Sequence, residues 1–139
     1  MKRIILLAFL CTTTLVMAQR INHVQEAIAN YDYEAALTLI AKEKPTIPLL
    51  LQKGKAQRGL GMNTEALSTY QEIIANDTAN TRAYIEAAEC CRSLAKYQQA
   101  LKYYEQALDL NPENKYVRIQ YIGLLLSLQK FQDALGESS

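Results

Sequence analysis

The stretch AKYQQALKYYEQALDLNP, residues 95–112, has the pattern of a helix that packs closely against other helices. Two small residues, Ala100 and Ala107, recur on one helical face, and Pro112 ends the run. Bulky side chains occupy the places between them on that face: Leu101, Tyr104 and Leu108. Alanine at fixed places within an apolar stripe indicates that another backbone comes close, so we expect neighbouring helices here.

The same pattern recurs along the chain at a constant interval. Residues 81–114 align without a gap on residues 47–80, and the same shift in numbering leads on to residues 115–139. The matched pairs include Leu50 and Tyr84, Gly54 and Ala88, Leu60 and Leu94, Ala66 and Ala100, Tyr70 and Tyr104, and Ile73 and Ala107. Self-similarity at a fixed interval predicts stacked units that contact only their neighbours.

Each unit is predicted to be two helices joined by a tight corner. In residues 81–114 the apolar stripe of the first helix consists of Tyr84, Ala87, Ala88 and Cys91. The stripe of the second helix consists of Tyr97, Ala100, Leu101, Tyr104, Ala107 and Leu108. Ala95 and Lys96 should form the corner between them. Gly59 and Gly61 supply the corresponding corner of the preceding unit, where a backbone without Cβ turns easily.

A two-helix unit of this length resembles the tetratricopeptide repeat. Residues 81–114 carry the family's pattern at Tyr84, Ala88, Leu94, Ala100, Tyr104, Ala107 and Pro112. In residues 47–80, Ile73 stands where alanine is usual and Thr78 where proline is usual. The resemblance implies an all-α fold, a right-handed α-solenoid of antiparallel helix pairs, that serves as a non-catalytic scaffold for protein–protein interaction.

The resemblance divides the chain into four repeats, two of them partial. Residues 19–46 are a shortened first repeat, because Ala36 lies closer in sequence to its counterpart Ala66 than Ala66 lies to Ala100. Residues 47–80 and 81–114 are full repeats, and residues 115–139 are an incomplete one, whose second helix is predicted to begin at Gln132 and stop. Ile122, Leu125 and Leu128 would then lack the helix that should cover them.

The uncovered end leaves two interpretations open. In the first, which we favour, the chain is a fragment of a longer array and forms the interaction or sensor segment of a larger exported protein. In the second, it is a structural array that self-associates through its uncapped C-terminal end.

Residues 1–18 are predicted to be a signal peptide. Lys2 and Arg3 precede an apolar run, and Val16 and Ala18 are suited to signal-peptidase cleavage before Gln19. The run is shorter than the roughly 20 residues of a membrane-spanning helix, which disfavours an anchor, and the large Leu10 before Cys11 disfavours lipidation. We therefore expect export to the periplasm or cell envelope, with secretion as an alternative and no membrane span left after cleavage.

Composition disfavours nucleic acid as a partner and disulfides as a framework. The chain has 15 Lys and Arg against 14 Asp and Glu, and removing Lys2 and Arg3 leaves 13 against 14. Because the net charge is close to zero, the chain as a whole has no positive electrostatic field that would attract nucleic acid or an anionic membrane. Cys90 and Cys91 are adjacent, and neighbours on one helix point about 100° apart, so we expect them to be buried helix residues that are not bridged.

No residue pattern predicts catalysis, a metal site or a cofactor. His23 is the only histidine, and no metal-ligand spacing surrounds it, so a surface role is expected. Gly54, Gly59 and Gly61 lack the spacing of a phosphate-binding loop and fall where the repeat requires small residues or a corner. We therefore expect a protein that is not an enzyme.

The partner-binding surface is predicted on the first helices of the repeats, which line the concave groove of a solenoid. Its residues are Leu51, Lys55, Arg58, Arg82, Ile85, Glu89, Arg92, Tyr116 and Ile119. Apolar residues beside cations favour a protein or peptide partner with apolar and acidic groups or a terminal carboxylate. The alternative is that the cations only solubilise an exposed face. Asparagines of the family's chaperone-binding clamp are missing, which disfavours a chaperone C-terminus as the partner.

Overall fold

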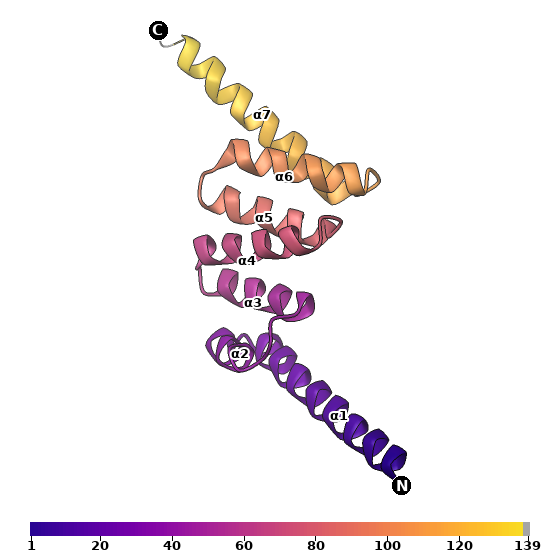
Figure 1. The fold of residues 1–139 in the computed structure, drawn as a ribbon. Helices are drawn as coiled ribbons and strands as arrows, with labels where there is room; N and C mark the ends of the chain where they lie inside the picture. Colours follow the sequence, from indigo (N-terminus) through magenta and orange to yellow (C-terminus); the bar gives the residue numbers. More distant parts are fainter. Residues whose placement is uncertain (138–139) are drawn as a thin grey trace. The chain divides into compact units, whose positions relative to one another are not determined.

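The computed structural model describes residues 1–137, and these residues form helices and no strands (Figure 1). The helices are α1 (Lys2–Ala29), α2 (Tyr33–Ile40), α3 (Ile47–Gly59), α4 (Asn63–Asn76), α5 (Thr81–Ser93), α6 (Tyr97–Leu110) and α7 (Lys115–Glu137). The predicted all-α class is confirmed. The chain divides into two compact units, the first Met1–Gly61 and the second beginning at Met62, and each is described by itself.

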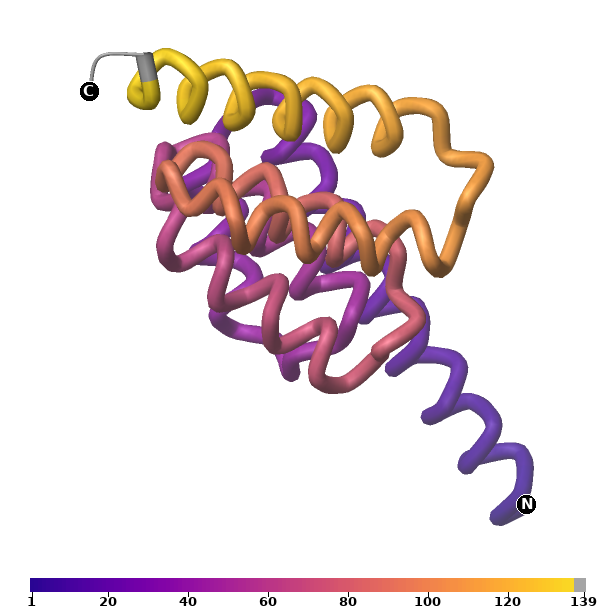
Figure 2. The backbone as a smooth tube through the Cα atoms, turned by 90° about the horizontal axis from the view of Figure 1, so that it is seen from above, coloured from indigo at the N-terminus to yellow at the C-terminus, as the bar shows by residue number. Residues whose placement is uncertain are grey.

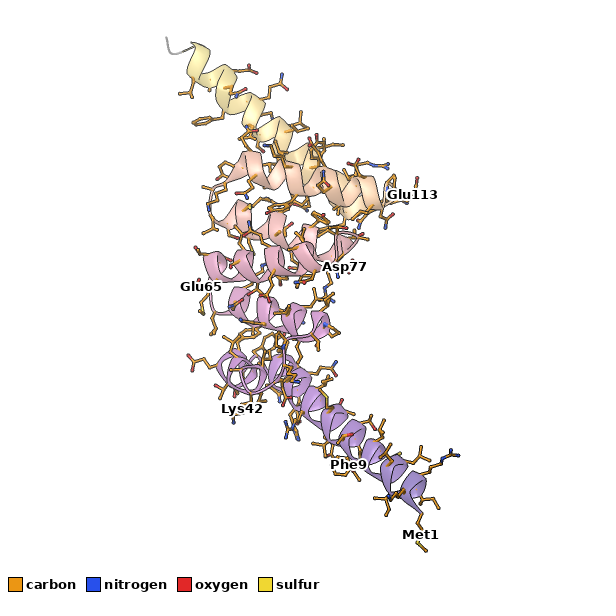
Figure 3. All side chains as sticks on the ribbon, viewed as in Figure 1. Met1, Phe9, Lys42, Glu65, Asp77 and Glu113 are labelled. Carbon is orange, nitrogen blue, oxygen red and sulfur yellow. The ribbon has the colours of Figure 1, made fainter. Side chains whose placement is uncertain are left out.

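In the first unit, α1, α2 and α3 pack around a small apolar core. The core consists of Val24, Ile28, Ala36, Ile40, Leu49 and Ala56. Only the last part of α1 contributes to it. Residues 1–18, which are predicted to be a signal peptide, are continuous with the rest of α1, and their side chains, Phe9 among them, stand out from the ribbon (Figure 3). The helix α1 is long and apolar enough to cross a membrane, which also fits a signal sequence at an N-terminus.

In the second unit, α4, α5, α6 and α7 pack in sequence, each against the next. Ala88, Ala100 and Ala107 are fully buried, as their place in the apolar stripes predicts, and so are Cys90 and Cys91. Neither cysteine is bridged. Tyr97 is an exception to the predicted stripe because 42% of it is exposed. Figure 2 shows α7 along one margin of this unit, beside α6.

The first helices of successive repeats begin with a side-chain cap at the same place. Thr46 Oγ1 accepts from the backbone N–H of Leu49 at 3.4 Å, Asn80 Oδ1 from Ala83 at 3.1 Å and Asn114 Oδ1 from Val117 at 3.1 Å. The three capping residues occupy equivalent positions, because the step between them equals the repeat interval (80 − 46 and 114 − 80). Since the first N–H groups of a helix have no partner within it, each cap fixes where a repeat starts.

The corners of the repeats share a left-handed residue. Tyr31 has φ 60°, Gly61 has φ 74° and Ala95 has φ 58°. Gly61 and Ala95 are equivalent in the full repeats, and Tyr31 holds the same place in the shortened one. Side chains other than glycine adopt this conformation at a cost of about 1–2 kcal/mol. Packing of the second helix of a repeat against the first offsets that cost at Tyr31 and Ala95.

The predicted corner in the last repeat is wrong. The next equivalent position after Ala95 is Gln129, yet α7 continues through it as one helix to Glu137. The second helix predicted from Gln132 therefore does not form within residues 132–137, and residues 138–139 of that prediction lie outside the described residues. No described segment packs on Ile122 or Leu125, 47% and 40% exposed, so nothing offsets the cost of a left-handed glutamine.

Candidate functional site

Helix α5 presents one largely polar face because its opposite face is filled by small residues. Ala83, Ala87 and Cys90 on that opposite face are fully buried. The residues on the other side of the helix, Ile85, Glu89 and Arg92, are half-buried. The Asn80 cap fixes the start of α5, so these three side chains emerge at set heights along it.

A hydrogen-bonded cluster links this face of α5 to α6 and α7. The Tyr104 hydroxyl of α6 donates to Glu89 Oε1 at 2.6 Å, and the Tyr116 hydroxyl of α7 donates to the same oxygen at 3.1 Å. Arg92 Nη1 lies 3.7 Å from Glu89 Oε2 and donates to Gln120 Oε1 of α7 at 2.5 Å. It also donates to the Tyr104 hydroxyl at 3.4 Å. One carboxylate therefore ties three helices together.

The surroundings of Tyr104 and Arg92 raise the pKa of both groups. Burial, reinforced by the hydrogen bond to Glu89, raises the pKa of the Tyr104 phenol well above its ordinary value of 10.0. The hydrogen bond with Tyr104 is the main cause that raises the pKa of the Arg92 guanidinium. Near neutral pH, Tyr104 thus stays a hydrogen-bond donor and Arg92 stays a cation.

A groove of about 730 Å³ opens beside the cluster, within the second unit. Its lining residues are Glu89, Arg92, Ser93, Tyr97, Leu124, Ser127, Leu128 and Phe131, and we call it the α5–α7 groove. Residues of α7 and the start of α6 form an apolar wall, whereas α5 contributes the polar side. Tyr97 and Phe131 occupy equivalent positions in successive repeats, and so do Ser93 and Ser127.

The hydroxyl oxygens of the two serines in the groove can still accept hydrogen bonds. Ser93 Oγ donates to the backbone oxygen of Glu89 at 3.1 Å, and Ser127 Oγ donates to that of Gly123 at 2.8 Å. A hydroxyl that donates its only proton to its own helix keeps two lone pairs as acceptors. Ser93 and Ser127 can therefore receive N–H groups of a bound chain.

The structure brings only some of the predicted partner-binding residues together. Glu89, Arg92 and Tyr116 meet in the cluster. Arg82 and Ile119 are exposed on α5 and α7, and neither lines the α5–α7 groove. On α3 of the first unit, Lys55 is exposed, while Leu51 and Arg58 are half-buried. The groove described here lies wholly in the second unit.

Several residues of this site escaped the sequence analysis. Tyr104 is predicted as a core residue only, although a buried phenol needs a hydrogen-bond partner and Glu89 on the preceding helix supplies it. Phe131 could be found from its equivalence to Tyr97. Gln120 could not, because its role depends on how α7 lies against α5.

The rest of the described chain offers little metal-binding chemistry. Among residues 1–137, no group of three or more His, Cys, Asp or Glu side chains could hold a metal ion. His23 is exposed on α1, with Nδ1 3.9 Å from Glu26 Oε2, as a surface histidine is predicted to be.

The comparisons with known proteins agree on the repeat. Two family models described as tetratricopeptide repeat match residues 51–114 and residues 92–137. No curated protein matches the sequence. Among solved structures, the first TPR of Spaghetti (RPAP3) bound to the HSP90 peptide SRMEEVD is 21% identical, with a TM-score of 0.75 over 81% of this chain and 92% of that one.

Two bacterial structures share the fold at a similarly low sequence identity. PcrH, known from Pseudomonas aeruginosa, in complex with the chaperone binding region of PopB is 17% identical, with a TM-score of 0.69 over 78% of this chain and 94% of that one. A tetratricopeptide repeat protein from Parabacteroides merdae is 22% identical, with a TM-score of 0.73 over 83% of this chain and 48% of that one. Together the two family models span residues 51–137, and this chain belongs to the tetratricopeptide repeat family.

Proposed function

We propose that this chain is a non-catalytic scaffold that binds a peptide or protein partner in the α5–α7 groove. The observation that carries the proposal is the groove itself, about 730 Å³, with an apolar wall facing a polar side. Such a combination suits recognition, because apolar side chains supply affinity and a few polar groups fix orientation.

The charge exposed in the groove favours an acidic group on the partner. The Arg92 side chain is 38% exposed, against 18% for Glu89. Both oxygens of the Glu89 carboxylate already face donors or a cation within the cluster. A carboxylate of the partner would find the guanidinium accessible, since only part of its five N–H donors is used inside the cluster.

The apolar wall favours a bulky side chain close to that acidic group. Leu124, Leu128, Phe131 and Tyr97 line it, and Phe131 is still 62% exposed. An aromatic or large aliphatic side chain of the partner would cover this surface. Ser93 and Ser127 would accept backbone N–H groups of the same segment.

Relatives of the fold support a protein or peptide as the class of partner. The Spaghetti (RPAP3) domain is bound to an HSP90 peptide, and PcrH is bound to a region of PopB. At 21% and 17% identity these structures share the fold, so their partners are not carried over to this chain.

The remaining sequence predictions belong to the same proposal. We propose that residues 1–18 are removed, that the mature chain works in the periplasm or cell envelope, and that it contains repeats 19–46, 47–80, 81–114 and 115–139. Leu51, Lys55 and Arg58 stay a proposal for a partner-contacting face of the first unit, as do Arg82, Ile85 and Ile119 for the second. Protein recovered from the cell envelope should begin at Gln19, and an N-terminus at Met1 would contradict cleavage.

The groove is tested by capture of the partner with two matched variants. Phe131→Asp puts a charge into the apolar wall, while Leu135→Asp changes a similarly exposed residue one turn farther along α7, outside the groove lining. Crosslinking in native cells, followed by mass spectrometry, should give a partner that wild type and Leu135→Asp retain and Phe131→Asp loses. Equal capture by all three would contradict recognition in the α5–α7 groove.

A further inference from the structure

Cleavage before Gln19 would give the mature chain a glutamine as its first residue. Gln19 follows Ala18 directly and is exposed on α1. The nitrogen of a glutamine inside a chain belongs to a peptide bond and is a poor nucleophile. At the start of a chain the nitrogen is a free amine, which can attack a carbonyl carbon. The new N-terminus would therefore hold a nucleophile and the amide carbon of its own side chain within one residue.

The reaction between these two groups is balanced within Gln19. The α-nitrogen attacks Cδ, so that the N–Cδ bond forms and the Cδ–Nε2 bond breaks. The proton lost by the amine leaves with Nε2 as ammonia, and no oxidant, reductant or cofactor takes part. The product is a five-membered lactam, pyroglutamate. Because both groups belong to one residue, the reaction needs no encounter between two molecules.

The start of the mature helix disfavours a positive charge. Without residues 1–18, α1 would begin at Gln19, and the positive end of its dipole would lie at the α-amine. The Glu43 carboxylate is already paired with Arg20 at 3.0 Å. The next carboxylate along α1 belongs to Glu26, about two turns farther on. An ammonium at Gln19 would thus be repelled by the helix dipole, whereas the lactam is neutral.

The residues that follow Gln19 are needed by the first unit. Arg20 Nη1 lies 3.0 Å from Glu43 Oε1, and the Glu43 side chain is only 12% exposed. Ile21 packs against the core of the unit. If an aminopeptidase removed Arg20, the mostly buried Glu43 carboxylate would lose this cation, which is costly. A lactam offers no α-amine to such an enzyme, so cyclisation would protect the ion pair.

We propose that Gln19 cyclises to pyroglutamate once residues 1–18 have been removed, so that the mature chain has no α-amine. The modification closes the chain one residue before the Arg20–Glu43 ion pair. It rests on the cleavage proposed above and is independent of recognition in the α5–α7 groove.

Mass spectrometry tests the cyclisation on the full chain, expressed with its leader and recovered from the cell envelope. The protein should be lighter than residues 19–139 by about 17 Da, the mass of ammonia, and fragment ions should place this loss at residue 19. A chain that starts at Met1 would overturn the cleavage and the cyclisation together. A chain that starts at Gln19 with its full mass would leave the cleavage intact and overturn the cyclisation alone.

Two matched variants assign the block to the side chain of Gln19. Gln19→Asn keeps an amide, but its α-nitrogen could close only a strained four-membered ring, so this variant should have a free amine. Gln25→Asn makes the same change at an exposed position inside α1 and should be blocked like wild type. N-terminal sequencing compares the three proteins. A readable wild type, or a Gln19→Asn variant that is also blocked, would overturn the proposal.

Enzymatic removal of the lactam identifies the blocking group. After the unfolded wild-type chain is treated with pyroglutamyl peptidase, N-terminal sequencing should begin at Arg20. A chain that stays blocked after this treatment carries a different group at its N-terminus, and that result would overturn the proposal.

Discussion

The hydroxyl of Tyr104 lies 2.6 Å from Oε1 of Glu89, so a residue of the helix core and a residue of the exposed face are joined by one hydrogen bond. Tyr104 is fully buried, so its hydroxyl is shielded from bulk solvent. A buried phenol without a partner is costly, which makes Glu89 structural as well as accessible. Glu89 therefore lines the groove and is also needed for the packing of α5 against α6.

Removing this hydroxyl should destabilise the protein measurably. We expect Tyr104→Phe to lower the free energy of unfolding by about 1–2 kcal/mol, because Glu89 and Arg92 each lose a partner. Tyr103→Phe is the matched control on the same helix, where the lost bond is an exposed one from Gln71. Chemical denaturation of both variants would measure the effect, and an equal loss in the two would argue against the cluster.

Enlarging a fully buried alanine should overpack the second unit. Ala100→Leu is expected to cost roughly 1–3 kcal/mol and to lower the melting temperature while helicity is largely kept. Ala75→Leu on exposed α4 surface serves as the control. Thermal unfolding followed by circular dichroism checks both, and an unchanged melting temperature for Ala100→Leu would count against the packing of α6.

Two glycines with equal space around them should respond to alanine in opposite directions. Neither Gly61 nor Gly123 has a neighbouring atom within 4 Å of an added Cβ. Gly61 has φ 74°, so Gly61→Ala should destabilise by about 1 kcal/mol. Gly123 lies inside α7, so Gly123→Ala should stabilise that helix by up to about 1 kcal/mol. If the two substitutions change the free energy of unfolding in the same direction, this account of the corner is refuted.

The contribution of Tyr104 to stability should fade at alkaline pH. Its pKa is raised in the folded state, so above pH 10 the unfolded phenol loses its proton first. The stabilisation is therefore complete below pH 10 and is lost as the pH rises toward the folded-state pKa. Denaturation at pH 8 to 11 should show the gap between wild type and Tyr104→Phe narrowing with pH. A constant gap would mean that the phenol titrates alike in both states.

Residue periodicity predicted most of the fold because small residues recur at the positions where helices pack closely. Ala88, Ala100 and Ala107 are buried where the pattern places them, and Ala95 turns the corner as expected. The failure at Gln129 has the opposite cause. A corner forms only where the next helix packs back on the preceding one, and the residues around Gln129 do not show whether that packing occurs.

The site was only partly predictable for a similar reason. Glu89 and Arg92 follow from their place on the repeat helix, yet the sequence does not show that they bind each other and Tyr104. Phe131 joins the groove wall because α7 continues as one helix past Leu128, whereas the sequence predicted that a second helix begins at Gln132. The polar side of the groove was thus predicted from the sequence, and its closure by Phe131 was not.

The caps and corners also locate the shortening of the first repeat. The stretch from the corner at Tyr31 to the cap at Thr46 is shorter than the stretch from Gly61 to Asn80 or from Ala95 to Asn114, which are equal. The difference is close to one helical turn, about 3.6 residues. Helix α2 has 8 residues where α4 and α6 have 14, and the connection after it, residues 41–46, is two residues longer than 77–80 or 111–114. The first repeat therefore loses the C-terminal part of its second helix and regains two residues as connection. What remains of the helix keeps its register, because Ala36 and Ile40 are buried like their equivalents Ala66 and Tyr70.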